Sequence, residues 1–79
     1  MKNKVVIKGY IAKMQYDRKE EKMHLLILHN RMYIHCVCPY IVENSVGEYV
    51  KVQGRIVGRM AGGVLLNEIE VKNKGIRRA

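Results

Sequence analysis

Hydrophobic and polar residues alternate along most of this chain with the two-residue period of β-strands. The segments that show the alternation or a dense β-branched and aromatic composition are 5–14, 23–29, 32–38, 48–57 and 64–72. They are separated by a charged run at 17–22, by Asn30-Arg31 and by a glycine-containing turn at 60–63. No segment of ten or more residues has the i, i+3, i+4 apolar spacing of a helix. The sequence therefore predicts an all-β protein of five strands.

The connection between the third and fourth predicted strands favours one type of barrel. Pro39 ends the third strand, because proline cannot donate a hydrogen bond to a ladder. Residues 39–47 then form the longest connection, with room for a short loop or a helical turn. A five-stranded Greek-key barrel, the OB-fold, crosses over at this point, and an SH3-like barrel is the alternative at this length. We predict an OB-fold over residues 1–73 and a short basic C-terminal tail over residues 74–79.

The second predicted strand is apolar on both faces. Its inward phase holds Met23, Leu25 and Ile27, and its other phase holds Leu26 and Leu28. A small barrel has one interior to fill, so the second stripe needs a cover. Docking of a second copy is the first explanation, and irregular register or a loop packed over the strand is the alternative. Because so short a chain buries only about 60% of its unfolded surface, we predict a homodimer or a higher homo-oligomer.

The charge balance points to an anionic partner. The 79 residues include 15 Lys and Arg against 7 Asp and Glu, which gives a formal net charge of +8. Such a surplus is typical of proteins that bind nucleic acid or an anionic membrane surface, although it also serves solubility. No run approaches the ~18 apolar residues of a membrane span, and the N-terminus lacks the apolar core of a secretion signal. We expect a cytoplasmic protein, either of a prokaryote or of the host of a plasmid or virus.

Binding of a single strand requires cations along a groove for the phosphates and flat side chains on which bases stack. Residues of both kinds share the outward phase of the predicted strands or lie in the adjoining loops. The candidates are Lys8, Tyr10, Lys13, Tyr16, Lys22, Arg31, Tyr33, His35, Tyr49, Lys51, Gln53, Arg55 and Arg59. Tyr10 and Tyr33 are the first choices for stacking and Tyr49 is the next; a merely solvated basic face is the alternative.

Catalytic and metal chemistry find little support in the sequence. Cys36 and Cys38 lie two residues apart on a strand, about 7 Å from each other, which suits buried reduced thiols better than a disulfide. His35 and Cys36 point to opposite faces, so neither a zinc site nor a nucleophile–base pair is expected. The chain has no glycine-rich phosphate loop and no Ser/His/Asp set. We therefore expect no enzymatic activity, no cofactor, no metal and no small-molecule substrate.

Four segments resemble a known family. Residues 46–56 (VGEYVKVQGRI) resemble the "kGdxVxVxGrl" strand of bacterial single-stranded-DNA-binding proteins, the SSB family, and most closely the related family of the primosomal replication protein PriB. Residues 5–11 (VVIKGYI) look like the opening strand, residues 35–39 like the third strand and residues 67–71 (NEIEV) like the closing strand. The likeness covers most of residues 3–73. It implies an OB-fold that binds single-stranded DNA in replication, recombination or repair, commonly as a homodimer or homotetramer.

Two departures from the family bear on function. The chain has no Trp and no Phe, the residues on which the tetrameric members mainly stack bases, so tyrosine would take that role. It also ends in a basic sequence in place of the long acidic tail through which bacterial members recruit other proteins. The resulting prediction is a protein that binds single-stranded DNA without sequence preference. The alternatives are an RNA-binding OB protein of the translation initiation-factor-one type and an OB module that binds another protein.

Overall fold

A computed structural model describes residues 4–79 as an all-β structure of five strands, as predicted. The strands are β1 (Lys4–Asp17), β2 (Lys22–His29), β3 (Met32–Cys38), β4 (Tyr49–Ala61) and β5 (Val64–Arg78). The described residues form no helix, and accordingly none that is long and apolar enough to cross a membrane.

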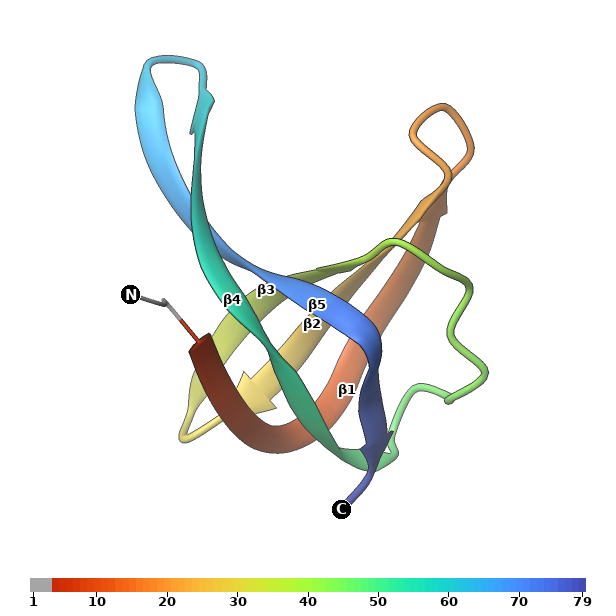
Figure 1. Cartoon of the computed structure of the whole chain (residues 1–79). Helices are drawn as coiled ribbons and strands as arrows, with labels where there is room; N and C mark the ends of the chain where they lie inside the picture. Colours follow the sequence, from red (N-terminus) through yellow and green to blue (C-terminus); the bar gives the residue numbers. More distant parts are fainter. Residues whose placement is uncertain (1–3) are drawn as a thin grey trace.

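The strands close into a barrel in the order β1-β2-β3-β5-β4, with β4 returning to β1 (Figure 1). Every pairing is antiparallel except the short contact between β3 and β5, where Cys36 lies opposite Ile69 and Val37 opposite Glu70. A five-stranded barrel with this strand order is an OB-fold, which confirms the predicted fold class.

Strand β1 takes part in both halves of the barrel because it bends. Residues 4–10 pair with β4, and residues 10–17 pair with β2. The bend requires a glycine at position 9: a Cβ atom there would lie 2.3 Å from the carbonyl oxygen of Leu28. Tyr10 consequently lies next to both β2 and β4.

The inward-facing side chains of all five strands form a single apolar core. Its most deeply buried members are Ile11, Leu25, Ile27, Cys36, Cys38, Val50, Val52 and Val71. The two cysteines are free thiols inside this core, as predicted, and burial raises the pKa of each to about 12. Both are therefore protonated and unreactive at neutral pH.

The prediction of a C-terminal tail over residues 74–79 is wrong, because these residues continue β5 and its pairing with β4. Ile76 lies opposite Val52 and Arg77 opposite Lys51, and the backbone N–H of Ala79 donates to the carbonyl of Tyr49 at 3.1 Å. A bulge hid this from the sequence pattern. Residues 72–75 of β5 face a single residue of β4, so the alternation breaks there and resumes at Ile76.

The connection between β3 and β4 contains no helical turn, contrary to one of the two forms predicted for it. It is held to the barrel by backbone hydrogen bonds: Gly47 N–H donates to the carbonyl of Ile11 at 2.8 Å, and Ile11 N–H donates to the carbonyl of Glu48 at 3.0 Å. Val42 from this connection is buried against the core. The loop thus closes one end of the barrel without regular structure.

Two hairpins extend beyond the barrel on the same side of the molecule, the β1–β2 hairpin and the β4–β5 hairpin (Figure 1). We call residues 56–67 of the second one the β4–β5 arm. Its apolar side chains are largely exposed, including Met60, Val64, Leu65 and Leu66. An isolated two-stranded ribbon is only marginally stable in water, so this arm is a surface that gains from being covered.

Candidate nucleic-acid interface

Two tyrosines from different strands form an exposed aromatic pair on the outside of the barrel. Tyr10 of β1 lies directly opposite Tyr49 of β4, and their ring centroids are 4.8 Å apart with the planes tilted by 55°. The residues are 53% and 44% exposed, respectively. The register of β1 against β4 therefore brings together two of the residues predicted to stack on bases.

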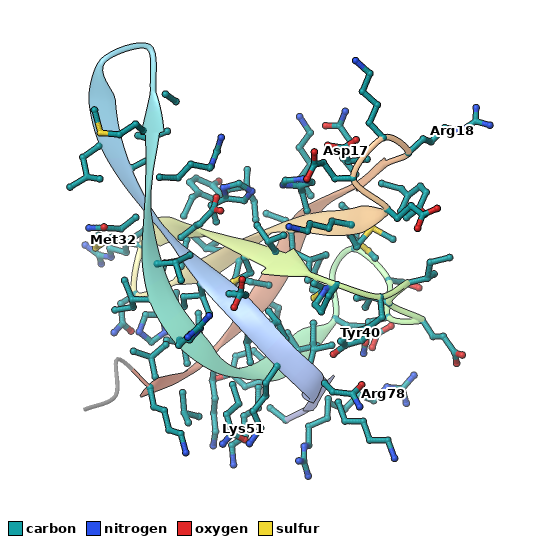
Figure 2. The ribbon with its side chains drawn as sticks, turned by 45° about the horizontal axis from the view of Figure 1, so that its top comes forward. Asp17, Arg18, Met32, Tyr40, Lys51 and Arg78 are labelled. Carbon is teal, nitrogen blue, oxygen red and sulfur yellow. The ribbon has the colours of Figure 1, made fainter. Side chains whose placement is uncertain are left out.

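A row of cations lies beside this aromatic pair. Lys8 is opposite Lys51 across β1 and β4, and Lys51 is in turn opposite Arg77 across β4 and β5. Directly opposed residues on antiparallel strands project from the same face of a sheet. Figure 2 shows Lys51 and Arg78 at the same end of the molecule, where β4 begins and β5 ends. We call the two tyrosines and these three cations the tyrosine–cation patch: Tyr10, Tyr49, Lys8, Lys51 and Arg77.

The cations of the patch carry uncompensated charge. Within residues 4–79, none of the three has a carboxylate oxygen within 4.0 Å. Like charges directly opposite each other on a sheet are destabilising, and a phosphate placed over the row would relieve that repulsion. Arg77 was absent from the predicted site because its segment was read as a tail; only the resumed alternation at Ile76 could have revealed it.

A second candidate surface, the β2 face, is the outer side of β1, β2 and β3. Three rows of opposed residues cross it: Tyr10, Leu28 and Tyr33; Lys13, Leu26 and His35; Gln15, His24 and Val37. Tyr33 is 64% exposed at the edge of the first row. Because Tyr10 belongs to this face as well as to the tyrosine–cation patch, the two surfaces are continuous.

The β2 face also holds the second apolar stripe that the sequence assigned to a docking partner. Leu26 and Leu28 are partly buried between the tyrosines, lysine and histidine of neighbouring strands. A shallow hollow over this region is lined by residues including Lys13, Gln15, His24 and Leu26. The apolar stripe and the predicted nucleic-acid residues therefore occupy one surface, and a single occupant would cover both.

His35, a predicted contact residue, is already engaged by two neighbours. Its Nε2 lies 2.9 Å from Nδ1 of His24, and its Nδ1 lies 3.1 Å from the carboxylate of Glu68. Burial lowers the pKa of His35 below its ordinary value of 6.5, Glu68 opposes this effect, and His24 and Arg59 add to it. His24 and Glu68 were missed by the sequence reasoning because their approach depends on the register of β3 against β2 and on the course of β5.

Several of the predicted cations are partly neutralised within the fold. Arg55 contacts the carboxylate of Glu70 at 3.0 Å, Arg59 contacts that of Glu68 at 3.3 Å, and Lys22 lies 4.0 Å from the carboxylate of Glu20. The exposed pairs of Arg55 and Lys22 are weak and can exchange for a phosphate, whereas the Glu68 side chain that pairs with Arg59 is only 11% exposed. Nevertheless, the unpaired cations Lys8, Lys51 and Arg77 are better placed to attract an anion.

The remaining predicted residues lie outside the centre of the two surfaces. Tyr16 is 40% exposed near the end of β1, but it lies opposite the core residue Met23 and so on the inward phase, because a register shift between Ile11 and Lys13 changes the phase of β1. Arg31 is exposed in the β2–β3 turn. Gln53 is half-buried in β4, opposite Val6 and beside the bulge of β5. Asp17 and Arg18 mark the β1–β2 loop, far from Lys51 in Figure 2. The residues predicted from the sequence thus fall into two groups: those on the continuous surface of the tyrosine–cation patch and the β2 face, and those scattered around it.

Comparisons with protein-family models, with curated proteins and with solved structures gave no match to this chain. Among residues 4–79, no three His, Cys, Asp or Glu side chains gather in a way that would hold a metal ion. The surface residues themselves therefore indicate the function.

Proposed function

We propose that this chain binds single-stranded DNA without sequence preference, as an accessory protein of replication, recombination or repair. The observation that carries the proposal is the row of uncompensated cations, Lys8, Lys51 and Arg77, beside the exposed ring pair of Tyr10 and Tyr49. Phosphates are attracted by such a row, and bases stack on such rings at about 1–3 kcal/mol per base.

The strand would run from the tyrosine–cation patch across Tyr10 to the β2 face and Tyr33. Leu26 and Leu28 supply an apolar floor between the two ends of that path. Contacts to ring faces and phosphates carry no base identity, because sequence is read at the base edges. This is the physical reason for proposing binding without sequence preference.

We further propose membership of the SSB and PriB group of OB-fold proteins. The two segments with the strongest resemblance, residues 5–11 and 46–56, are hydrogen-bonded neighbours: Val5 lies opposite Gly54 and Tyr10 opposite Tyr49. The similar motifs therefore build the same strand pair that carries the tyrosine–cation patch. The buried free thiols Cys36 and Cys38 suit a reducing compartment, and we propose the cytoplasm.

A homodimer is part of this proposal, with the β4–β5 arm as its contact surface in place of β2. Arg59 is the only charged residue of the arm, and it is paired with Glu68. On a chain of net charge +8, two copies meet the least repulsion at this neutral, apolar segment. Leu65→Asp would place a charge in that contact, and light scattering should then report the monomer mass instead of the dimer mass.

Fluorescence anisotropy with labelled oligo(dT), a duplex of the same length and oligo(rU), each at two salt concentrations, tests the binding proposal. We expect tighter binding of oligo(dT) than of duplex, and weaker binding at higher salt. The double variant Lys8→Glu/Lys51→Glu should abolish binding. Lys72→Glu, a single charge reversal at an exposed position outside both surfaces, is the control.

Three results would contradict the proposal. Affinity for oligo(dT) no greater than for duplex at low salt would remove the single-strand preference. A clear preference for oligo(rU) would favour the RNA-binding alternative. Absence of any nucleic-acid binding would favour a protein-interaction module.

A further inference from the structure

Five ionisable side chains from all five strands form a continuous line over the β2 face. Asp17 Oδ2 lies 3.9 Å from Nε2 of His24, whose Nδ1 lies 2.9 Å from Nε2 of His35. Nδ1 of His35 lies 3.1 Å from Oε2 of Glu68, and the same oxygen accepts from Nε of Arg59 at 3.3 Å. The line connects the β1–β2 hairpin to the β4–β5 arm, and its centre is a pair of stacked imidazoles.

The contacts determine which ring nitrogens carry protons. Nδ1 of His35 faces a carboxylate, so it carries a hydrogen and donates a hydrogen bond to Glu68. Neutral His35 then has a bare Nε2, which accepts the hydrogen bond from Nδ1–H of His24. Since a neutral imidazole has one N–H, Nε2 of His24 is also bare, and it faces the carboxylate of Asp17. An acceptor facing an anion is a position where a proton is favourable.

The pair can take up one proton without losing a contact, but not two. A proton on Nε2 of His24 turns that ring into an imidazolium between Asp17 and neutral His35, and every hydrogen bond of the line remains. A second proton would have to bind Nε2 of His35, which would break the 2.9 Å bond. It would also create two cations whose ring centroids are 5.1 Å apart, in a partly buried position.

The surroundings of the pair make its charge relevant to an anionic ligand. Lys13 of β1 lies in the row that contains His35, and it lines the hollow together with both histidines. Lys22 lies opposite Asp17 at the start of β2. The charged groups around the two histidines are thus Asp17, Glu68, Arg59, Lys13 and Lys22. Uptake of one proton by the histidine pair adds one positive charge to this set.

We propose that the binding of a nucleic-acid strand to the β2 face is coupled to the uptake of one proton by the His24–His35 pair. This inference rests on the proposed function, because it concerns the same surface. A polyanion stabilises the more positive state of the face, so the bound complex holds the proton at a higher pH than the free protein does. Affinity consequently rises as the pH falls, by at most about one logarithmic unit per pH unit.

Two measurements on the full chain test the coupling. In the free protein, an NMR pH titration of the imidazole resonances should show His24 and His35 responding together to a single proton. Near the midpoint of that titration the free protein already holds about half a proton on average, so calorimetric titration with oligo(dT) in two buffers of different ionisation enthalpy should show net proton uptake approaching about one half per bound protein. His24→Gln should remove this uptake, and His29→Gln, a histidine in the β2–β3 turn region, should retain it.

The outcomes separate the coupling from the function on which it rests. If the unaltered protein binds oligo(dT) without proton uptake, the coupling is overturned and the proposed function remains intact. The same holds if the proton uptake persists in His24→Gln. Two independent histidine titrations in the free protein would overturn the shared-proton arrangement. No binding of oligo(dT) at any pH would overturn the proposed function and the coupling together.

Discussion

Arg77 lies directly opposite Lys51 on the antiparallel strands β5 and β4, so that two cations face each other across a hydrogen-bonded ladder. Lys8 extends the same row on β1. A like-charge pair in this position costs about 0.2–1 kcal/mol of folding free energy. Such a row is consistent with an anion-binding surface. A bound anion relieves the repulsion between the cations, and this relief adds to the free energy of binding.

The row predicts opposite effects of one substitution on folding and on binding. Arg77→Gln should leave stability unchanged or raise it slightly, while weakening oligo(dT) binding and lowering the salt slope of log K by about 0.7. Chemical denaturation and anisotropy titrations at several salt concentrations measure the two effects. Lys72→Gln should change neither appreciably, and a parallel loss of stability and binding in Arg77→Gln would show that the residue acts through the fold.

Tyr10 should be the most sensitive stacking residue, because it belongs to both candidate surfaces. Replacing it by leucine removes the ring but keeps an apolar side chain on an exposed position, so the barrel should remain folded. We expect a loss of about 1–3 kcal/mol in binding, or roughly 5- to 150-fold in Kd. Tyr10→Phe should bind nearly as well as the unaltered chain, since it keeps the ring face.

The chain offers a direct optical readout for the same experiment. It contains five tyrosines and no tryptophan, so tyrosine emission is observable without interference. Stacked bases should quench this emission in the unaltered protein, and the quenching should decrease in Tyr10→Leu. Undiminished quenching and affinity in that variant would mean that bases stack elsewhere.

The stability of the fold should depend on pH through His35. Burial is the largest cause of its lowered pKa, so the unfolded chain binds a proton more readily than the folded chain does. The free energy of unfolding must therefore decrease as the pH falls through 6.5, the ordinary histidine value, toward the lower pKa of the folded state. Urea denaturation at pH 7.5 and pH 5.5 measures this decrease.

The variant His35→Gln separates the contribution of His35 to the pH dependence of stability from that of Glu48, the other group with a shifted pKa that titrates in acid. His35→Gln should be less stable at pH 7.5, because it loses the contacts to His24 and Glu68, but it should show a smaller decrease between the two pH values. Hydrogen bonds from Asn44 and Ser45 lower the pKa of Glu48, so its contribution is lost only as the pH falls below 4.5. An unchanged pH dependence in His35→Gln would contradict the assignment to His35.

The fold was accessible to sequence reasoning because most strands of a small barrel keep a strict inside–outside alternation. Val50 and Val52 face the core, whereas Tyr49 and Lys51 face solvent, as their phase predicts. The pattern failed where the backbone departs from regular geometry. The bulge at residues 72–75, in which Lys74 has a φ of 60°, interrupts the phase of β5 and makes its end resemble a tail.

The candidate site was only partly predictable, because opposition across strands depends on register. The outward phase identified Lys8, Tyr10, Tyr49 and Lys51 one strand at a time. Their alignment into a ring pair and a cation row follows from the pairing of β1 with β4, which the sequence does not specify. Ion pairs such as Arg55 with Glu70 likewise join residues from different strands, so the sequence could not tell paired cations from free ones.

Removal of residues 74–79 distinguishes a strand from a tail. Ile76 is half-buried and packs against the core opposite Val52, and Ala79 bonds to the backbone of Tyr49. Deletion should therefore destabilise the barrel by at least about 2 kcal/mol and lower Tm by roughly 10 °C. The double variant Arg77→Gln/Arg78→Gln removes the charges but keeps the strand, and it should melt near the unaltered protein. Equal melting temperatures for the truncated and full chains would mean that this segment does not pair with β4 in solution, and Arg77 could then not belong to the tyrosine–cation patch.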